Sequence, residues 1–167
     1  MNYKTITYPD VNNGIGLRVT LWLQGCSHHC FNCQNPMMWD ENGGKKFDET
    51  VKEQLFELLS KPYIKGLTLS GGDPLYSIKD LVPLLEEVKT NFPEKNIWLY
   101  TGFTFKQILI NKYLRQVLDY VDVIVDGKFD NELKDISIAF RGSTNQNIWE
   151  KRSDNTWCVN NDKYDNV

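Results

Sequence analysis

Apolar and polar positions follow two different periods along this chain. Residues 16–23 alternate as a strand does, with a polar or small residue between apolar ones. Residues 64–69 form a short apolar run that ends at Ser70-Gly71-Gly72-Asp73-Pro74, which predicts a buried strand followed by a glycine turn. Two further apolar runs, 97–100 and 121–125, predict a third and a fourth strand.

Helical spacing appears between these strands. A first helix is predicted to start after Asp48 as its N-cap, from the apolar positions Phe47, Val51, Leu55, Leu58 and Leu59. A second is marked by Leu81, Leu84, Leu85 and Val88. Asp80 as the cap would place Pro83 in the first turn, where backbone N–H groups lack partners.

The remaining segments have weaker patterns. Residues 105–118 predict one or two short helical pieces, and residues 42–44 predict a loop. Residues 135–149 are ambiguous between a last strand and an extended segment, and the polar tail after Glu150 is expected to be mobile.

The alternation of strands and helices predicts an α/β fold built from parallel βαβ units. In such folds ligands bind at the carboxyl ends of the strands. Cys26, Gly71-Gly72, Thr101-Gly102 and Asp126-Gly127 each follow a predicted strand. These strand ends are therefore expected to converge on one site.

Length and composition fit one globular domain over residues 1–167, with a polar tail from about residue 150. Apolar residues make up 41% of the chain, charged residues 25%, and the net charge is −3 without any basic block. Nucleic acid is therefore an unexpected partner. Without a long apolar run or a signal-like N-terminus, we expect a cytoplasmic protein that does not bind membranes.

Three of the four cysteines form the pattern C-x3-C-x2-C at Cys26, Cys30 and Cys33, and Cys158 stands alone near the C-terminus. Clustered cysteines in such a chain favour metal binding over disulfides. Structural zinc sites and ordinary [4Fe–4S] clusters both take four protein ligands. Three cysteines thus leave one coordination position open, unless His28 or His29 completes a zinc site.

The cysteine pattern after a first strand, followed by a strand that ends in Gly-Gly-Asp-Pro, resembles the radical S-adenosylmethionine (SAM) superfamily. Within it the chain is similar to the activating proteins of anaerobic ribonucleoside-triphosphate reductase. The similarity covers roughly residues 10–149. It runs through the segments Gly25–Trp39, Leu67–Leu75, Tyr100–Phe103, Asp122–Phe129 and Phe140–Gln146.

This resemblance implies a partial (βα) barrel of the radical SAM type, with mostly parallel strands and a [4Fe–4S] cluster at its C-terminal mouth. Cys26, Cys30 and Cys33 would bind three irons, and SAM would chelate the fourth. No catalytic residue beyond these ligands is implied. The SAM site would include Gly71, Gly72, Asp73, Pro74 and Thr101, with Asn32 and Gln34 near the adenosyl group. Trp22, Trp39 and Trp98 are expected in the core.

The implied activity is reductive cleavage of SAM to a 5′-deoxyadenosyl radical, which generates a glycyl radical on the large subunit of the reductase. A one-electron donor such as flavodoxin would be a second partner. Three alternatives stay open: an activase of another glycyl-radical enzyme such as pyruvate formate-lyase, a small-molecule enzyme acting on a pterin-derived substrate, and a non-catalytic zinc or iron–sulfur module. Cys158 is expected to have no role.

Overall fold

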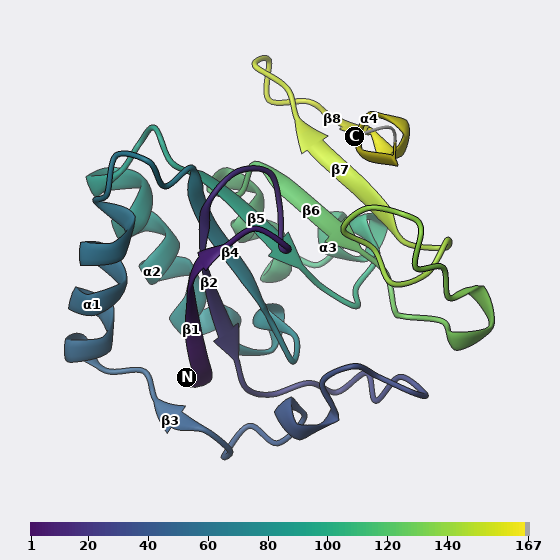
Figure 1. The fold of residues 1–167 in the computed structure, drawn as a ribbon, viewed down its shortest axis with the longest axis horizontal. Coiled ribbons are helices and arrows are strands. Elements are labelled where there is room, and N and C mark those ends of the chain that lie inside the picture. The colour runs from purple at the N-terminus through teal and green to yellow at the C-terminus, as the bar shows by residue number, and fades with distance from the viewer. Residues whose placement is uncertain (166–167) are drawn as a thin grey trace.

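The computed structural model describes residues 1–165, which form one eight-stranded sheet with helices against it (Figure 1). Residues 166 and 167 of the predicted domain lie outside the described residues. The strands are β1 Asn2–Asp10, β2 Arg18–Leu23, β3 Lys45–Lys46, β4 Gly66–Gly71, β5 Asn96–Tyr100, β6 Val123–Asp126, β7 Asn147–Lys151 and β8 Trp157–Val159. The α-helices are α1 Glu49–Leu59, α2 Ile78–Asn91, α3 Phe105–Ile110 and α4 Asn161–Asp165. Short 3₁₀ segments cover Pro36–Met38, Pro74–Ser77, Leu114–Asp119 and Asn131–Leu133.

The sheet has the strand order β3-β1-β2-β4-β5-β6-β7-β8. Its centre is parallel, because β2 pairs with β4, β4 with β5, and β5 with β6 in the same direction. The flanking strands β1, β3, β7 and β8 pair antiparallel. The α/β class and the parallel βαβ units predicted from the sequence are therefore confirmed.

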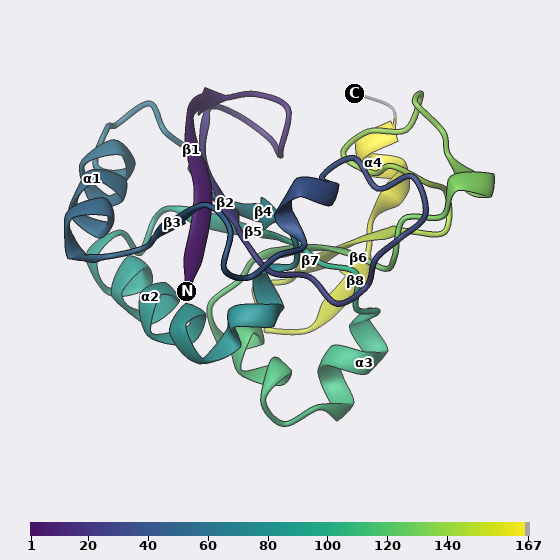
Figure 2. The ribbon, with the colours of Figure 1, turned by 90° about the horizontal axis from the view of Figure 1, so that it is seen from below.

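Strand alternation gives the sheet two faces with different roles. Leu21, Leu69, Leu99 and Ile124 belong to the larger apolar core, together with buried side chains of α1, α2 and α3. Figure 2 shows these three helices on one side of the sheet and α4 on the other. The opposite face, called the inner face below, carries only α4 among the α-helices of residues 1–165 and has room for a site at the carboxyl ends of the strands.

The inner face is filled near the N-terminal ends of the strands. Trp98 and Tyr164 are both almost fully buried, and their rings meet edge to face with centroids 5.5 Å apart. Arg18 is fully buried beside them, with its guanidinium 5.5 Å from the centre of the Trp98 ring. It donates hydrogen bonds to Thr68 and to Asn96, and so joins β2 to β4 and β5. Burial lowers the pKa of Arg18 to about 10.

Helix starts follow the local chemistry of the chain. The carboxylate of Asp48 accepts a hydrogen bond from the Val51 amide at 3.1 Å, so the predicted N-cap of α1 is confirmed. The predicted start of α2 is wrong. This helix begins at Ile78, directly after the 3₁₀ segment at Pro74–Ser77, and Pro83 lies inside it rather than in its first turn. Packing of buried Leu81, Leu84 and Leu85 accounts for a helix that propensity alone disfavours.

Two terminal segments differ from the sequence predictions. The strand β1 was not predicted, and it pairs with β2 from Tyr3 to Asp10. The polar tail expected to be mobile forms β8, which extends the sheet beside β7, and α4, which buries Tyr164. The ambiguous segment at 135–149 ends in β7, as one of its two interpretations required. No helix within residues 1–165 is long and apolar enough to cross a membrane.

Candidate iron–sulfur site

A cavity of about 440 Å³ opens on the inner face at the carboxyl ends of the parallel strands. Its wall includes Cys26 after β2, Gly71-Gly72 at the end of β4, Thr101-Gly102 after β5 and Gly127 after β6. The convergence of four strand ends on one site is therefore confirmed. The wall also contains side chains from the last two residues of each strand that point to the inner face. These are Trp22, Ser70, Tyr100 and Val125.

Cys26, Cys30 and Cys33 all line this cavity and are half-buried. Backbone hydrogen bonds hold the loop that carries them. The amide of Cys26 donates to Trp39 O at 3.1 Å, and the amide of Cys33 donates to Cys30 O at 3.1 Å. All three thiols therefore reach the cavity from one loop, which backbone hydrogen bonds hold in place.

The environment of Cys26 and Cys30 disfavours the free thiolate. Burial raises the pKa of Cys26, the charge of Asp73 raises it further, and a hydrogen bond from the His28 amide opposes the change. Burial also raises the pKa of Cys30, with Cys33 adding to the effect. Coordination by iron reverses this direction, because a metal-bound thiol is deprotonated.

The donor set fits a cluster better than a single metal ion. Within the described residues, no three His, Cys, Asp or Glu side chains are arranged to hold one ion. A [4Fe–4S] cluster binds each cysteine to a different iron, so its ligands need to surround a larger body. The histidines proposed for a zinc site are also engaged elsewhere. His28 Nε2 lies 2.6 Å from Asp73 Oδ2, and the His29 ring packs against Trp39 with centroids 4.7 Å apart.

Gly71 and Gly72 line the cavity where the end of β4 lies against the backbone of Leu23 and Gly25. A Cβ on Gly71 would lie 2.3 Å from Leu23 O, and one on Gly72 would lie 2.5 Å from Gly25 O. Gly71 also has a φ of 115°, in the region that favours glycine. These glycines therefore let the end of β4 contact the backbone that leads into the cysteine loop, and they keep this part of the wall free of side chains.

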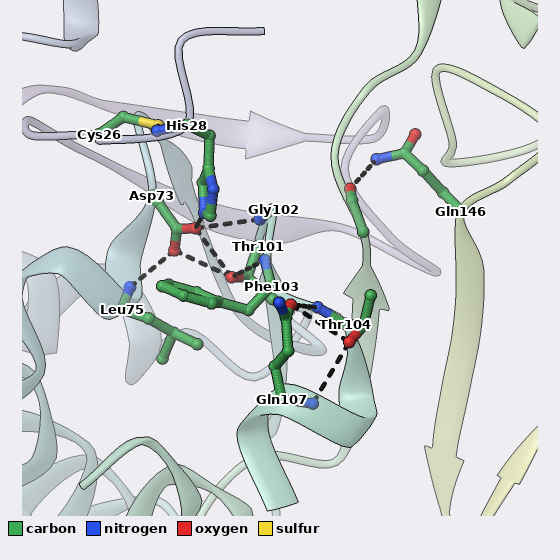
Figure 3. Close-up of polar contacts among 11 residues, drawn as sticks. Cys26, His28, Asp73, Leu75, Thr101, Gly102, Phe103, Thr104, Gln107 and Gln146 are labelled. Atoms are coloured by element: carbon green, nitrogen blue, oxygen red, sulfur yellow. Dashed lines mark hydrogen bonds and ion pairs between the residues drawn. The ribbon is translucent and has the colours of Figure 1, made fainter. Parts of the chain in front are cut away.

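Asp73 is buried, with 1% of its side chain exposed, and its carboxylate is fully used by protein groups (Figure 3). It accepts hydrogen bonds from the Leu75 amide at 2.9 Å, the Gly102 amide at 3.0 Å and the Thr101 hydroxyl at 2.9 Å and 3.0 Å. The Nε2–H of His28 is the fourth donor. Asp73 thus joins the ends of β4 and β5 to the cysteine loop.

The other residues expected at the SAM site divide into two groups. Gln34 and Thr101 line the cavity with the two glycines. Asn32, Asp73 and Pro74 are absent from its wall, and the Asn32 side chain donates instead to Asn131 Oδ1 at 3.1 Å. Cys158 is also remote from the wall. It lies in β8, with its thiol 3.8 Å from Glu150 O.

Several residues of the wall were missed by sequence reasoning. Trp22 and Trp39, expected in the core, line the cavity, and so do Tyr100 and Arg141. Within the described residues, Trp39 Nε1, Tyr100 OH and Arg141 Nε are buried without a hydrogen-bond partner. Unpaired buried polar atoms are costly, so these groups suit a polar ligand.

Comparison with known proteins places this site in a class. The family model of the 4Fe-4S single cluster domain matches residues 12–149, which include all three clustered cysteines. The chain therefore belongs to the class of proteins with a domain for a single iron–sulfur cluster.

Relatives make the assignment more specific. Three proteins named anaerobic ribonucleoside-triphosphate reductase-activating protein are similar along almost the whole chain. The protein from Enterobacteria phage T4 is 44% identical, covering 94% of this chain and 98% of its own length. The one from Pasteurella multocida is 40% identical, covering 89% and 97%, and the one from Escherichia coli K12 is 38% identical, covering 91% and 100%. The chain belongs to the family of anaerobic ribonucleoside-triphosphate reductase-activating proteins.

Proposed function

We propose that this protein activates anaerobic ribonucleoside-triphosphate reductase by generating a glycyl radical on its large subunit. The observation that carries the proposal is the single cavity that gathers three cysteines with four strand ends, in a chain of this family. The fold is, in this proposal, a single radical SAM domain: a partial (βα) barrel with its cofactors at the C-terminal mouth. The parallel run from β2 to β6 supports that assignment.

The cofactors of the proposal are a [4Fe–4S] cluster on Cys26, Cys30 and Cys33, and SAM in the cavity beside it. When bound, they would supply a one-electron cleavage of SAM and a 5′-deoxyadenosyl radical that removes hydrogen from a glycine Cα. Gln34, Gly71, Gly72 and Thr101 would contact SAM from the wall. Asn32 would lie at its edge, and Asp73 and Pro74 would act beneath the wall by fixing the strand ends.

The chain's own residues would mainly position the reactants and limit water access. Half-buried thiols and a cavity with aromatic walls from Trp22, Trp39 and Phe140 support this role. The open side of the cavity would receive a glycine-bearing loop of the reductase. A one-electron donor such as flavodoxin, in the cytoplasm, would complete the system.

The proposal is tested by anaerobic reconstitution with iron and sulfide, followed by dithionite and SAM, with the reductase present. We expect 5′-deoxyadenosine and a glycyl-radical EPR signal on the reductase. Cys30→Ala should abolish both, and Cys158→Ala, remote from the cavity, should leave both unchanged. A wild-type protein that binds one zinc ion tightly and no cluster would contradict the proposal.

A further inference from the structure

His28 stands between two of the clustered cysteines, yet its side chain leaves their loop and reaches the ends of β4 and β5 (Figure 3). Only 8% of the side chain is exposed. His28 Nε2 lies 2.6 Å from Asp73 Oδ2, and a carboxylate oxygen accepts, so the ring nitrogen is the donor. The bond spans 45 residues of sequence, so it joins separate parts of the fold rather than closing a local turn.

The ring is also held by its apolar faces. It meets the Phe103 ring edge to face, with centroids 4.6 Å apart. A Cβ built on Gly102 would lie 2.4 Å from His28 Cδ2. The glycine at 102 therefore leaves the space that the imidazole occupies. The hydrogen bond to Asp73 and the packing against Phe103 thus favour the same orientation of the His28 ring.

Asp73, the partner of His28, is itself immobilised. Its carboxylate also accepts from Leu75 and Gly102 amides and from the Thr101 hydroxyl. A side chain held on so many sides is a rigid anchor. Thr101 and Gly102 line the cavity with His28, so the anchor connects the loop that carries the thiols to the wall expected to hold SAM.

We infer that His28 is a positioning residue that locks the cysteine loop against the SAM-binding ends of β4 and β5. The inference rests on the proposed function and adds a residue to it. The neighbouring His29 provides a contrast, because its ring contacts Trp39 and it makes no link to Asp73. Loss of the hydrogen bond from His28 to Asp73 should let the cysteine loop move relative to the SAM-binding strand ends, while all three thiols stay present.

The test compares His28→Ala, His28→Gln and the matched control Ser27→Ala, at an exposed position of the same loop. Glutamine can place an N–H the same number of bonds from the backbone as histidine Nε2, so it can restore the bond to Asp73. Each variant is reconstituted under identical anaerobic conditions. Iron and sulfide per chain are measured, and SAM is then titrated against the EPR spectrum of the reduced cluster.

We expect His28→Ala to bind less iron, or to bind SAM about tenfold more weakly, as for a lost buried hydrogen bond to a charged group. His28→Gln should recover most of whichever property is lost, and Ser27→Ala should match the wild type. Wild-type iron content and SAM affinity in His28→Ala would overturn the inference, as would a Gln variant that recovers nothing. A wild-type protein that binds no cluster or no SAM would instead contradict the proposed function.

Discussion

Three buried polar atoms on the wall of the cavity lack a partner within the described residues: Trp39 Nε1, Tyr100 OH and Arg141 Nε. Leaving such a group unpaired costs roughly 1–3 kcal/mol. Tyr100 illustrates the situation best, because its hydroxyl lies at the end of β5, directly before the Thr101-Gly102 turn. Burial also raises the pKa of Tyr100, which keeps the phenol protonated as a donor.

Replacing Tyr100 by Phe therefore has opposite expected effects with and without ligand. Without SAM, removal of an unpaired buried hydroxyl should leave the melting temperature unchanged or slightly higher. With SAM and cluster bound, the stabilisation by SAM should shrink, equivalent to a roughly threefold to tenfold higher Kd. Thermal unfolding with and without SAM measures both. An unchanged SAM-induced shift in the variant would show that the hydroxyl does not contact the ligand.

The sequence could predict the cysteines of this site but not its aromatic wall. Three thiols in eight residues carry their own signal. Trp98 and Tyr100 share one face of β5, but Ile97 and Leu99 on the other face are equally apolar. Buried parallel strands are apolar on both faces. The pattern therefore could not indicate which face would hold the cavity, and His28 looked like an ordinary loop residue until Asp73 was placed beside it.

At the scale of elements, the tail from β8 to α4 is held by pairing of β8 with β7 and by the side chain of Glu150 in β7. Its carboxylate accepts from Asn160, Tyr164 and Lys163, the last at 2.6 Å. Burial opposes ionisation of Glu150, yet these hydrogen bonds outweigh it and lower its pKa. Tyr164 in turn packs on Trp98 and Phe140, so the tail helps to close the inner face below the cavity.

Because the pKa of Glu150 is lowered on folding, its contribution to stability is present above the ordinary glutamate pKa of about 4.3 and is lost as the pH falls through the lower folded value. Glu150→Gln should reduce the free energy of unfolding by about 1 kcal/mol at pH 7, and the difference from wild type should shrink as the pH falls through the lowered pKa of the folded state. Urea unfolding at several pH values measures this. Glu53→Gln, on the exposed side of α1, is the control. A difference that persists unchanged at low pH would contradict the assignment.

Elements with a strong local signal were predictable, and those that depend on distant pairing were not. Asp48 starts α1 through a bond three residues away. In contrast, β1 has mostly exposed or half-buried residues and forms only because β2 accepts it as a partner. The start of α2 differs from the prediction for a local reason, since Asp73 caps a 3₁₀ segment through the Leu75 amide and this segment leads directly into Ile78.

For the whole molecule, the core and the cysteine site are separate structures. The larger apolar core gathers side chains of β2, β4, β5, β6 and the helices, and none of the three clustered cysteines belongs to it. Each fully buried Leu or Ile in such a core stabilises the fold by roughly 1.5–3 kcal/mol. The fold should therefore persist without a metal, unlike a small zinc module whose folding energy comes from its ion.

A variant with Cys26, Cys30 and Cys33 all replaced by Ala tests this separation. We expect it to bind no iron, to keep the far-UV circular dichroism of the iron-free wild type, and to melt cooperatively within about 4 °C of it, since a change of 1 kcal/mol moves the melting temperature of a domain of this size by roughly 2–4 °C. Leu85→Ala, in the core, should instead cost about 2–5 kcal/mol. Loss of a cooperative transition in the triple variant would mean that the cysteine loop holds the fold together. If the iron-free wild type itself lacked a cooperative transition, the metal would be structural, and the non-catalytic alternative would gain support over radical chemistry.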